Sequence, residues 1–119
     1  MKPAEQVRPI FAAFDAKHVS TFASFMADDV RLHLGNAEPV EGKPAFVEAV
    51  NAFLGSVASF RHEVINVWHD GDVLVTELDV HYTRLDGRQV TVPCCNVFRL
   101  RDGLVAEYRS YIDATPVYA

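Results

Sequence analysis

The chain has 119 residues, of which 50% are hydrophobic and 23% charged, and its formal net charge is −5. These values are typical of one globular domain over residues 1–119 and exclude a wholly disordered chain. They also argue against a nucleic-acid partner, because phosphate contacts need clustered Lys and Arg. No apolar run approaches the roughly 20 residues that span a bilayer. Residues 1–10 lack the apolar segment of a signal peptide, so we expect a cytoplasmic protein without a membrane partner.

The first half of the chain predicts three helices and one strand. Apolar residues recur at helical spacing in residues 4–17, and a second, short helix fits residues 20–27. Residues 30–34 alternate apolar and polar side chains, which predicts a strand. A third helix is predicted from residue 43 to about residue 57.

The second half predicts four consecutive strands, over residues 60–69, 73–84, 89–101 and 104–113. Each of the three connections contains Asp-Gly, a typical hairpin signal, so the strands should form an antiparallel meander. The meander must bury a face, and the three helices are its only cover. We therefore expect an α+β fold, a curved antiparallel sheet packed against three N-terminal helices. Because sheets twist and curl, this cone should leave a pocket for a small organic molecule.

Three segments resemble a known superfamily. They are Phe-Met-Ala-Asp-Asp-Val at residues 25–30, Gly42 before the third helix, and the stretch from Asn96 to Asp113. Together with the order of the elements, they are similar to the nuclear-transport-factor-2-like superfamily and, within it, to SnoaL-like proteins. The resemblance implies a cone-shaped α+β barrel. It does not choose an activity, because this fold hosts isomerases, polyketide cyclases, epoxide hydrolases, dehydratases and non-catalytic binders.

The resemblance also implies which strand residues face the pocket, because side chains alternate between the faces of a strand. Alignment on two family members places these side chains inside: Leu32, Leu34, Glu77, Asp79, His81, Val92, Cys94, Asn96, Phe98, Tyr108, Ser110 and Ile112. A slip of register at the turn of residues 84–88 would exchange the three ionisable ones for Leu78, Val80 and Tyr82.

Two well-understood chemistries of the superfamily do not transfer intact. Ketosteroid isomerases use an aspartate base, and that position holds Leu34, although Asn96 could still act as an oxyanion donor. Limonene-type epoxide hydrolases use an Asp-Arg-Asp set, of which only Asp79 is matched, with Glu77 replacing the arginine. An epoxide-hydrolase-like enzyme with an altered site is therefore the weaker alternative.

We expect the catalytic residues to be Asp79, His81 and Glu77. If the strand has the parity that the resemblance implies, three ionisable groups line one wall of an apolar cone. Burial raises a carboxylate pKa, and a neighbouring imidazole can share the proton, which suits general acid–base work near neutral pH. The alternative is that the three side chains lie on the outer face and pair with Arg109 or Arg99 in solvent.

Ligand binding is expected to centre on Asn96, as a hydrogen-bond donor at the floor of the cone, although a buried asparagine can equally pin a strand or hold a water. Other expected pocket residues are Tyr108, Ser110, Leu34, Cys94, Phe98, Ile112 and Phe14. The Cys94 thiol, among apolar neighbours, should stay protonated and inert. The other histidines are scattered without ligand spacing, so we expect no metal and no cofactor.

The sequence thus leads to one hypothesis and its rivals. The leading one is an isomerase- or cyclase-type enzyme that moves a proton on a small apolar carbonyl or polyketide-like compound. A non-catalytic protein that binds a similar ligand, and a scaffold that uses the fold only to dimerise, are the alternatives. A homodimer is expected through an apolar outer sheet face carrying Leu74, Thr76, Leu78, Val80, Arg109 and Tyr111.

Overall fold

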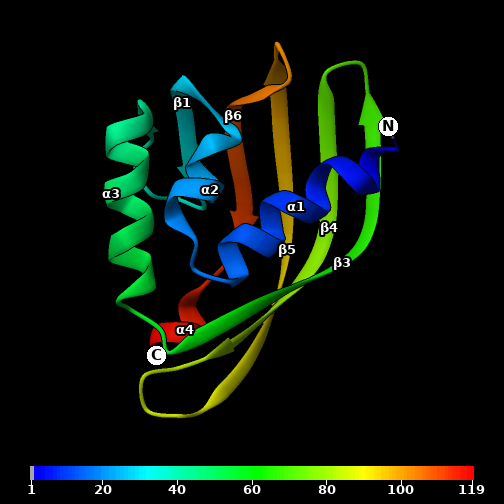
Figure 1. Ribbon diagram of the computed structural model, residues 1–119. Helices are drawn as coiled ribbons and strands as arrows, with labels where there is room; N and C mark the ends of the chain where they lie inside the picture. Colours follow the sequence, from blue (N-terminus) through cyan, green and yellow to red (C-terminus); the bar gives the residue numbers. More distant parts are fainter. Residues whose placement is uncertain (1) are drawn as a thin grey trace.

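The first half of the chain forms three helices and two strands (Figure 1). The computed structural model describes residues 2–119. In chain order the elements are α1 (Pro3–Asp15), α2 (Val19–Ser24), β1 (Met26–Leu34), β2 (Val40–Glu41) and α3 (Lys43–Leu54). The predicted order of helix, helix, strand and helix is confirmed. Strand β2 is an addition that local patterns do not predict.

The second half contains the four predicted strands. They are β3 (Ser59–Asp70), β4 (Val73–Thr83), β5 (Gln89–Arg101) and β6 (Leu104–Ile112), followed by the short helix α4 (Thr115–Tyr118). The four strands are confirmed to within a residue or so at each end, whereas α4 is not predicted. This last helix contributes to the site described below.

The boundary between α2 and β1 differs from the prediction. A helix is predicted over residues 20–27, but α2 ends at Ser24 and β1 already begins at Met26. The backbone N–H of Val105 donates to the Phe25 carbonyl at 2.9 Å, and Met26 pairs with Val105 in β6. Residues 26 and 27, which the local pattern assigns to the helix, therefore belong to β1 because this strand pairs with the sheet.

The six strands form one curved, open sheet in the order β2-β1-β6-β5-β4-β3. Strands β3 to β6 pair as an antiparallel meander, but β1 and β6 run parallel. The expected antiparallel sheet is confirmed for these four strands, and the parallel pairing of β1 with β6 is an addition to it. Parallel neighbours need a long crossover connection, which α3 and the meander supply here.

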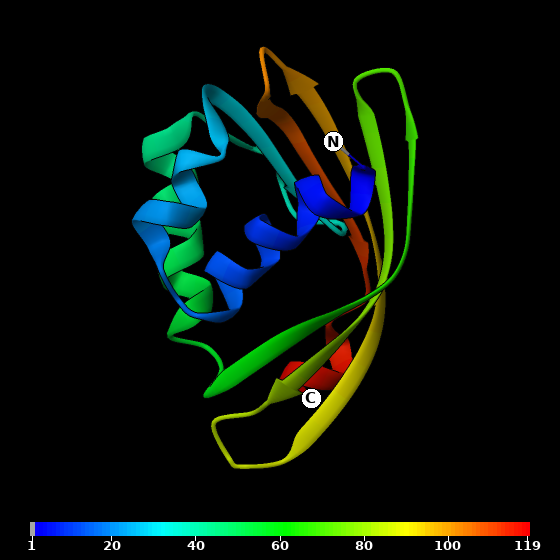
Figure 2. The same cartoon turned by 45° about the vertical axis from the view of Figure 1, so that its right-hand side comes forward.

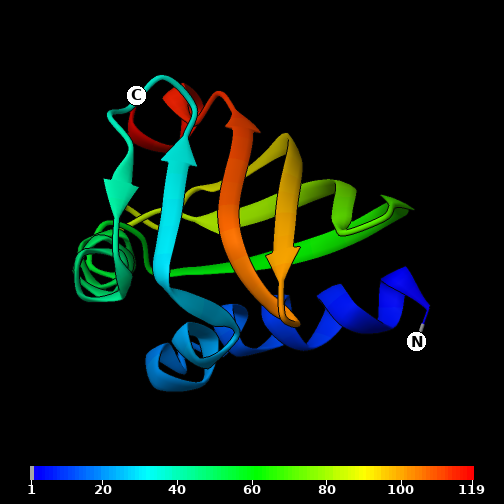
Figure 3. The same ribbon diagram turned by 90° about the horizontal axis from the view of Figure 1, so that it is seen from above.

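Helices α1, α2 and α3 lie on the concave face of the sheet (Figure 2), and the view from above shows α1 and α2 along that face (Figure 3). Their apolar stripes are buried, with Val7 and Phe11 on α1 and Phe46 on α3 at most 2% exposed. Removing these stripes from water is the main force that holds the helices to the sheet. Each described helix is too short or too polar to span a membrane.

The parity of β4 is opposite to that implied by the resemblance. Its alternate residues Leu74, Thr76, Leu78, Val80 and Tyr82 are buried on the concave face. Burying this row removes apolar surface from water, whereas burying the intervening charged row would carry a large desolvation cost. The hydrophobic pattern therefore selects the alternative register, in which Leu78, Val80 and Tyr82 face inward.

The convex face consequently differs from the surface predicted for a dimer. Leu74, Thr76, Leu78 and Val80 are not part of it, whereas Arg109 and Tyr111 are, with the guanidinium 5.8 Å from the ring centroid. The strand register places Trp68, Val75, Val97 and Cys95 beside them. Association into a homodimer through this face stays a prediction.

One buried hydroxyl of the inner row lacks a partner. Thr76 is 0% exposed, and its Oγ1 has no hydrogen-bond partner among residues 2–119. We predict that Thr76→Val raises the unfolding free energy by about 1 kcal/mol, because valine keeps the shape and removes an unsatisfied polar group. Denaturant unfolding measures the change. Thr91→Val, at an exposed hydroxyl bonded to His81 at 2.8 Å, should not stabilise the fold. A less stable Thr76→Val protein would contradict the prediction.

Candidate functional site

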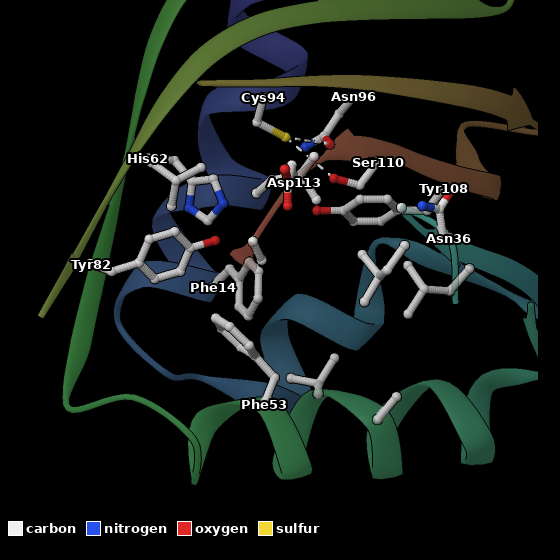
Figure 4. Close-up of a pocket in the computed structure, with 18 of the residues that line it drawn as sticks. Phe14, Asn36, Phe53, His62, Tyr82, Cys94, Asn96, Tyr108, Ser110 and Asp113 are labelled. Atoms are coloured by element: carbon white, nitrogen blue, oxygen red, sulfur yellow. Dashed lines mark hydrogen bonds between the residues drawn. The ribbon is translucent and has the colours of Figure 1, made fainter. Parts of the chain in front are cut away.

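The sheet and helices enclose a cavity of about 660 Å³ (Figure 4). Its helix side is apolar and is lined by Phe14, Phe22, Phe46, Ala49, Val50 and Phe53. Its sheet side carries the polar groups His62, Tyr82, Cys94, Asn96, Tyr108 and Ser110. A ligand in this space would therefore contact hydrocarbon on one side and hydrogen-bonding groups on the other.

Most of the side chains expected to bind a ligand do line this cavity. They are Asn96, Tyr108, Ser110, Leu34, Cys94, Ile112 and Phe14. Phe98 does not line it. This ring is 0% exposed and packs between Phe11 and Tyr108, with centroid separations of 5.9 and 4.6 Å. Its role is to fill the core beneath α1.

The placement of Glu77, Asp79 and His81 inside the cavity is wrong. They lie on the convex face, where Glu77 Oε1 accepts a hydrogen bond from Asn66 Nδ2 at 2.9 Å. His81 Nε2 lies 2.7 Å from Glu63 Oε1. The hydrogen bond from His81 lowers the pKa of the Glu63 carboxyl. These groups form an exposed polar ladder on the far side of the sheet from the cavity.

A different histidine–carboxylate pair stands at the cavity. His62 Nδ1 on β3 lies 2.6 Å from Asp15 Oδ1 at the end of α1, and the His62 backbone N–H donates to Asp15 Oδ2 at 3.0 Å. The two side chains are 6% and 22% exposed. An ionised carboxylate only accepts hydrogen bonds, so in a neutral imidazole paired with it Nδ1 carries the proton and Nε2 has the lone pair.

Aromatic rings hold the His62 imidazole in place. Phe11 stacks on it with centroids 4.7 Å apart and planes at 21°, while Phe14 lies at 5.3 Å and Phe60 meets it edge-on at 5.8 Å. The imidazole is thus shielded from bulk water except where it lines the cavity. Its orientation is fixed by both the carboxylate and the rings.

The sequence holds a signal for this pair that the prediction of Asp79, His81 and Glu77 did not use. Phe60 is the apolar start of an alternating strand, so His62 falls on the same inward face. Asp15 directly follows the apolar stripe of α1. Each residue alone is unremarkable, and only the tertiary packing of α1 on β3 brings them together.

Two tyrosine hydroxyls point into the cavity. Tyr82 and Tyr108 are 7% and 4% exposed, and neither phenol oxygen has a hydrogen-bond partner among the described residues. Figure 4 shows both oxygens directed toward the middle of the site. Burial strongly raises the pKa of both phenols, so each stays protonated and can donate.

The floor is a small polar cluster on β5 and β6. The Cys94 thiol donates to Asn96 Oδ1 at 3.3 Å and lies 3.3 Å from Ser110 Oγ. Burial raises the pKa of this thiol, as expected for an inert wall residue. With its oxygen occupied, Asn96 retains the amide nitrogen as a donor toward the cavity.

The mouth is marked by the exposed residues that line the cavity: Leu34, Asn36, Asp113, Thr115 and Tyr118. Helix α4 forms one side, and Tyr118 Oη lies 2.8 Å from Ser56 Oγ at the end of α3. Within residues 2–119, no group of three or more His, Cys, Asp or Glu is arranged to hold a metal ion.

The model of the SnoaL-like domain family matches residues 7–108, which is most of the chain. This protein therefore belongs to the SnoaL-like family. Among curated proteins no match is found.

Solved structures show the same fold at low sequence identity. An NTF2-like protein of unknown function from Burkholderia pseudomallei has a TM-score of 0.90 at 18% identity, with 100% of each chain covered. A Jannaschia protein provisionally assigned as a SnoaL-like polyketide cyclase has a TM-score of 0.84 at 21% identity, with 97% of this chain and 88% of that one covered. An LEH-like epoxide hydrolase from M. tuberculosis has a TM-score of 0.81 at 19% identity, with 98% of this chain and 86% of that one covered. The resemblance to this superfamily is confirmed for the fold.

The raised phenol pKa values predict how the fold responds to alkali. As the pH rises past 10.0, the ordinary pKa of a tyrosine, the unfolded chain releases the Tyr82 proton and the folded chain keeps it. Stability is therefore unaffected below about pH 10 and falls as pH rises above it. In the native protein, Tyr82→Phe should leave the phenolate absorbance that develops between about pH 9 and 11 unchanged. In denaturant, the phenolate absorbance of the same variant should be smaller than that of the wild-type protein by the contribution of one tyrosine. A reduced native signal would contradict the assignment.

Proposed function

We propose that this SnoaL-like protein is an acid–base enzyme that moves a proton on a small apolar carbonyl or polyketide-like compound. His62 is the base, and Asp15 is the residue that positions it. The observation that carries the proposal is the Asp15–His62 pair, buried at the wall of a cavity that also holds unpartnered donors. The proposed reaction class is isomerisation or cyclisation.

The chemistry begins with the substrate oxygen. A carbonyl oxygen on the sheet side accepts hydrogen bonds from the phenols of Tyr82 and Tyr108 and from the Asn96 amide, which polarises the C=O bond. The Nε2 lone pair of His62 then removes a proton from the adjacent carbon, and the electron pair of that C–H bond moves to form an enolate. The phenol donors stabilise the negative oxygen.

Asp15 also has an effect after the proton has moved. Its carboxylate faces Nδ1 at 2.6 Å and stabilises the imidazolium that forms. The enolate can regain the proton from Nε2 at another carbon, which isomerises the substrate. It can instead attack a second carbonyl in the same molecule, which closes a ring and places the returned proton on the new alkoxide. Both routes leave the enzyme unchanged.

The test uses β-tetralone, a compact apolar ketone with exchangeable protons beside its carbonyl. Proton NMR in deuterium oxide follows the loss of these protons. The wild-type protein should accelerate exchange over buffer, and His62→Gln should lower the rate by about 100-fold, the usual scale of a positioned general base. Asp15→Asn should lower it too, because the imidazole loses its fixed tautomer.

The chain provides a matched control. His81 contacts Glu63 at 2.7 Å, nearly the separation of the proposed pair, but lies on the convex face. His81→Gln and Asp79→Asn should leave exchange unchanged. Equal losses in His81→Gln and His62→Gln would remove the assignment of the base. Binding of β-tetralone without any acceleration would favour a protein that only binds its ligand.

A further inference from the structure

The cavity is unusual in the charges that surround it. None of the described residues that line it is Lys or Arg, whereas Asp113 contributes a carboxylate at the mouth and Asp15 stands behind His62. The cation that contacts α4 already has partners for both of its terminal nitrogens. Arg84 Nη2 lies 3.1 Å from Asp86 Oδ2, and Nη1 donates to the Pro116 carbonyl at 3.1 Å. Asp113 is thus the one carboxylate among the described lining residues, and no Lys or Arg lies beside it in that lining.

Asp113 has one oxygen free for a ligand. Its Oδ1 accepts hydrogen bonds from the Thr115 backbone N–H at 3.0 Å and the Thr115 hydroxyl at 2.5 Å. Oδ2 has no partner among residues 2–119. The two hydrogen bonds lower the pKa of this carboxyl, so it is ionised at neutral pH. In Figure 4 the carboxylate lies among the lining side chains near the middle of the view.

Aromatic rings are frequent in the rest of the lining. Seven Phe and Tyr side chains line the cavity, and one of them, Tyr118, stands at the mouth on the same short segment as Asp113. An ammonium group is attracted to the faces of such rings, and a carboxylate beside them adds a charged partner. A carboxylate at the mouth would meet the like charge of Asp113, and none of the described lining residues is a Lys or Arg that could offset it.

We propose that the ligand of this cavity carries a protonated amine, held at the mouth by Asp113, and an apolar body that lies among the phenylalanines. The proposal deepens the proposed function, because it concerns the same cavity, but it requires only binding. A carboxylate or phosphate at the same end of the ligand is disfavoured.

The test compares three probes with one ring system: naphthylmethylamine, naphthylmethanol and naphthoic acid. Dissociation constants come from calorimetric titration of the full chain at neutral pH and low salt. We expect the amine to bind about threefold to tenfold more tightly than the alcohol, which is the scale of a partly exposed ion pair with a ring contact. The acid should bind most weakly of the three.

Asp113→Asn should bring the affinity of the amine down to that of the alcohol, because asparagine keeps the acceptor for Thr115 and removes the charge. Asp72→Asn, which makes the same change of net charge in the exposed β3–β4 turn, should preserve the difference between the probes. Equal binding of amine and alcohol, or an amine preference that survives in Asp113→Asn, overturns the proposal. So does acid binding as tight as the amine, or the absence of binding by all three. Because no turnover is measured, failure of the His62 assignment leaves this result standing.

Discussion

The carboxylate of Asp15 joins the two layers of the molecule at the point where the site is built. Asp15 Oδ2 accepts a hydrogen bond from the backbone N–H of His62 at 3.0 Å. Asp15 Oδ1 lies 2.6 Å from Nδ1 of the same residue. The end of α1 is thereby fixed against β3. The hydrogen bond that places the helix also selects which nitrogen of the imidazole carries its proton. The same Asp15–His62 contact therefore holds α1 against β3 and orients the imidazole at this wall of the cavity.

The second constraint is the alternation of β4. Because Leu78, Val80 and Tyr82 face the helices, the charged row of the strand must face outward. The protein therefore has two histidine–carboxylate pairs with nearly equal separations and different surroundings. The His62 side chain is 6% exposed among aromatic rings, and that of His81 is 31% exposed on the sheet surface. The environment, more than the pairing itself, separates a candidate base from a surface contact.

The sequence predicts the fold well because local signals agree with one another. The helical stripes and the three Asp-Gly turns leave few arrangements for the meander. It predicts part of the site as well, since Asn96, Tyr108 and Ser110 lie on strands with unambiguous alternation. It fails at Glu77, Asp79 and His81, because an alignment carried across the turn of residues 84–88 outweighed the hydrophobic pattern of the strand itself. Asp15 and His62 were missed because they are 47 residues apart, and no local pattern records which strand a helix crosses.

The cavity of this SnoaL-like protein thus has an oriented imidazole on one wall, protonated phenols on the sheet side, and a carboxylate at its mouth. The polar groups come from strands β3 to β6 and from the segment around α4. The apolar faces of α1, α2 and α3 cover the site, and Asp15 at the end of α1 also holds the imidazole of His62.

The central claim is that Asp15 fixes His62 as the tautomer whose Nε2 is unprotonated. Long-range nitrogen–proton correlation NMR reports the tautomer of each of the five histidines. The account predicts that His62 has its proton on Nδ1 in the wild-type protein and becomes a mixture of tautomers in Asp15→Asn. A His62 proton on Nε2 in the wild-type protein would contradict it, because the ring could then not accept a proton from a ligand in the cavity.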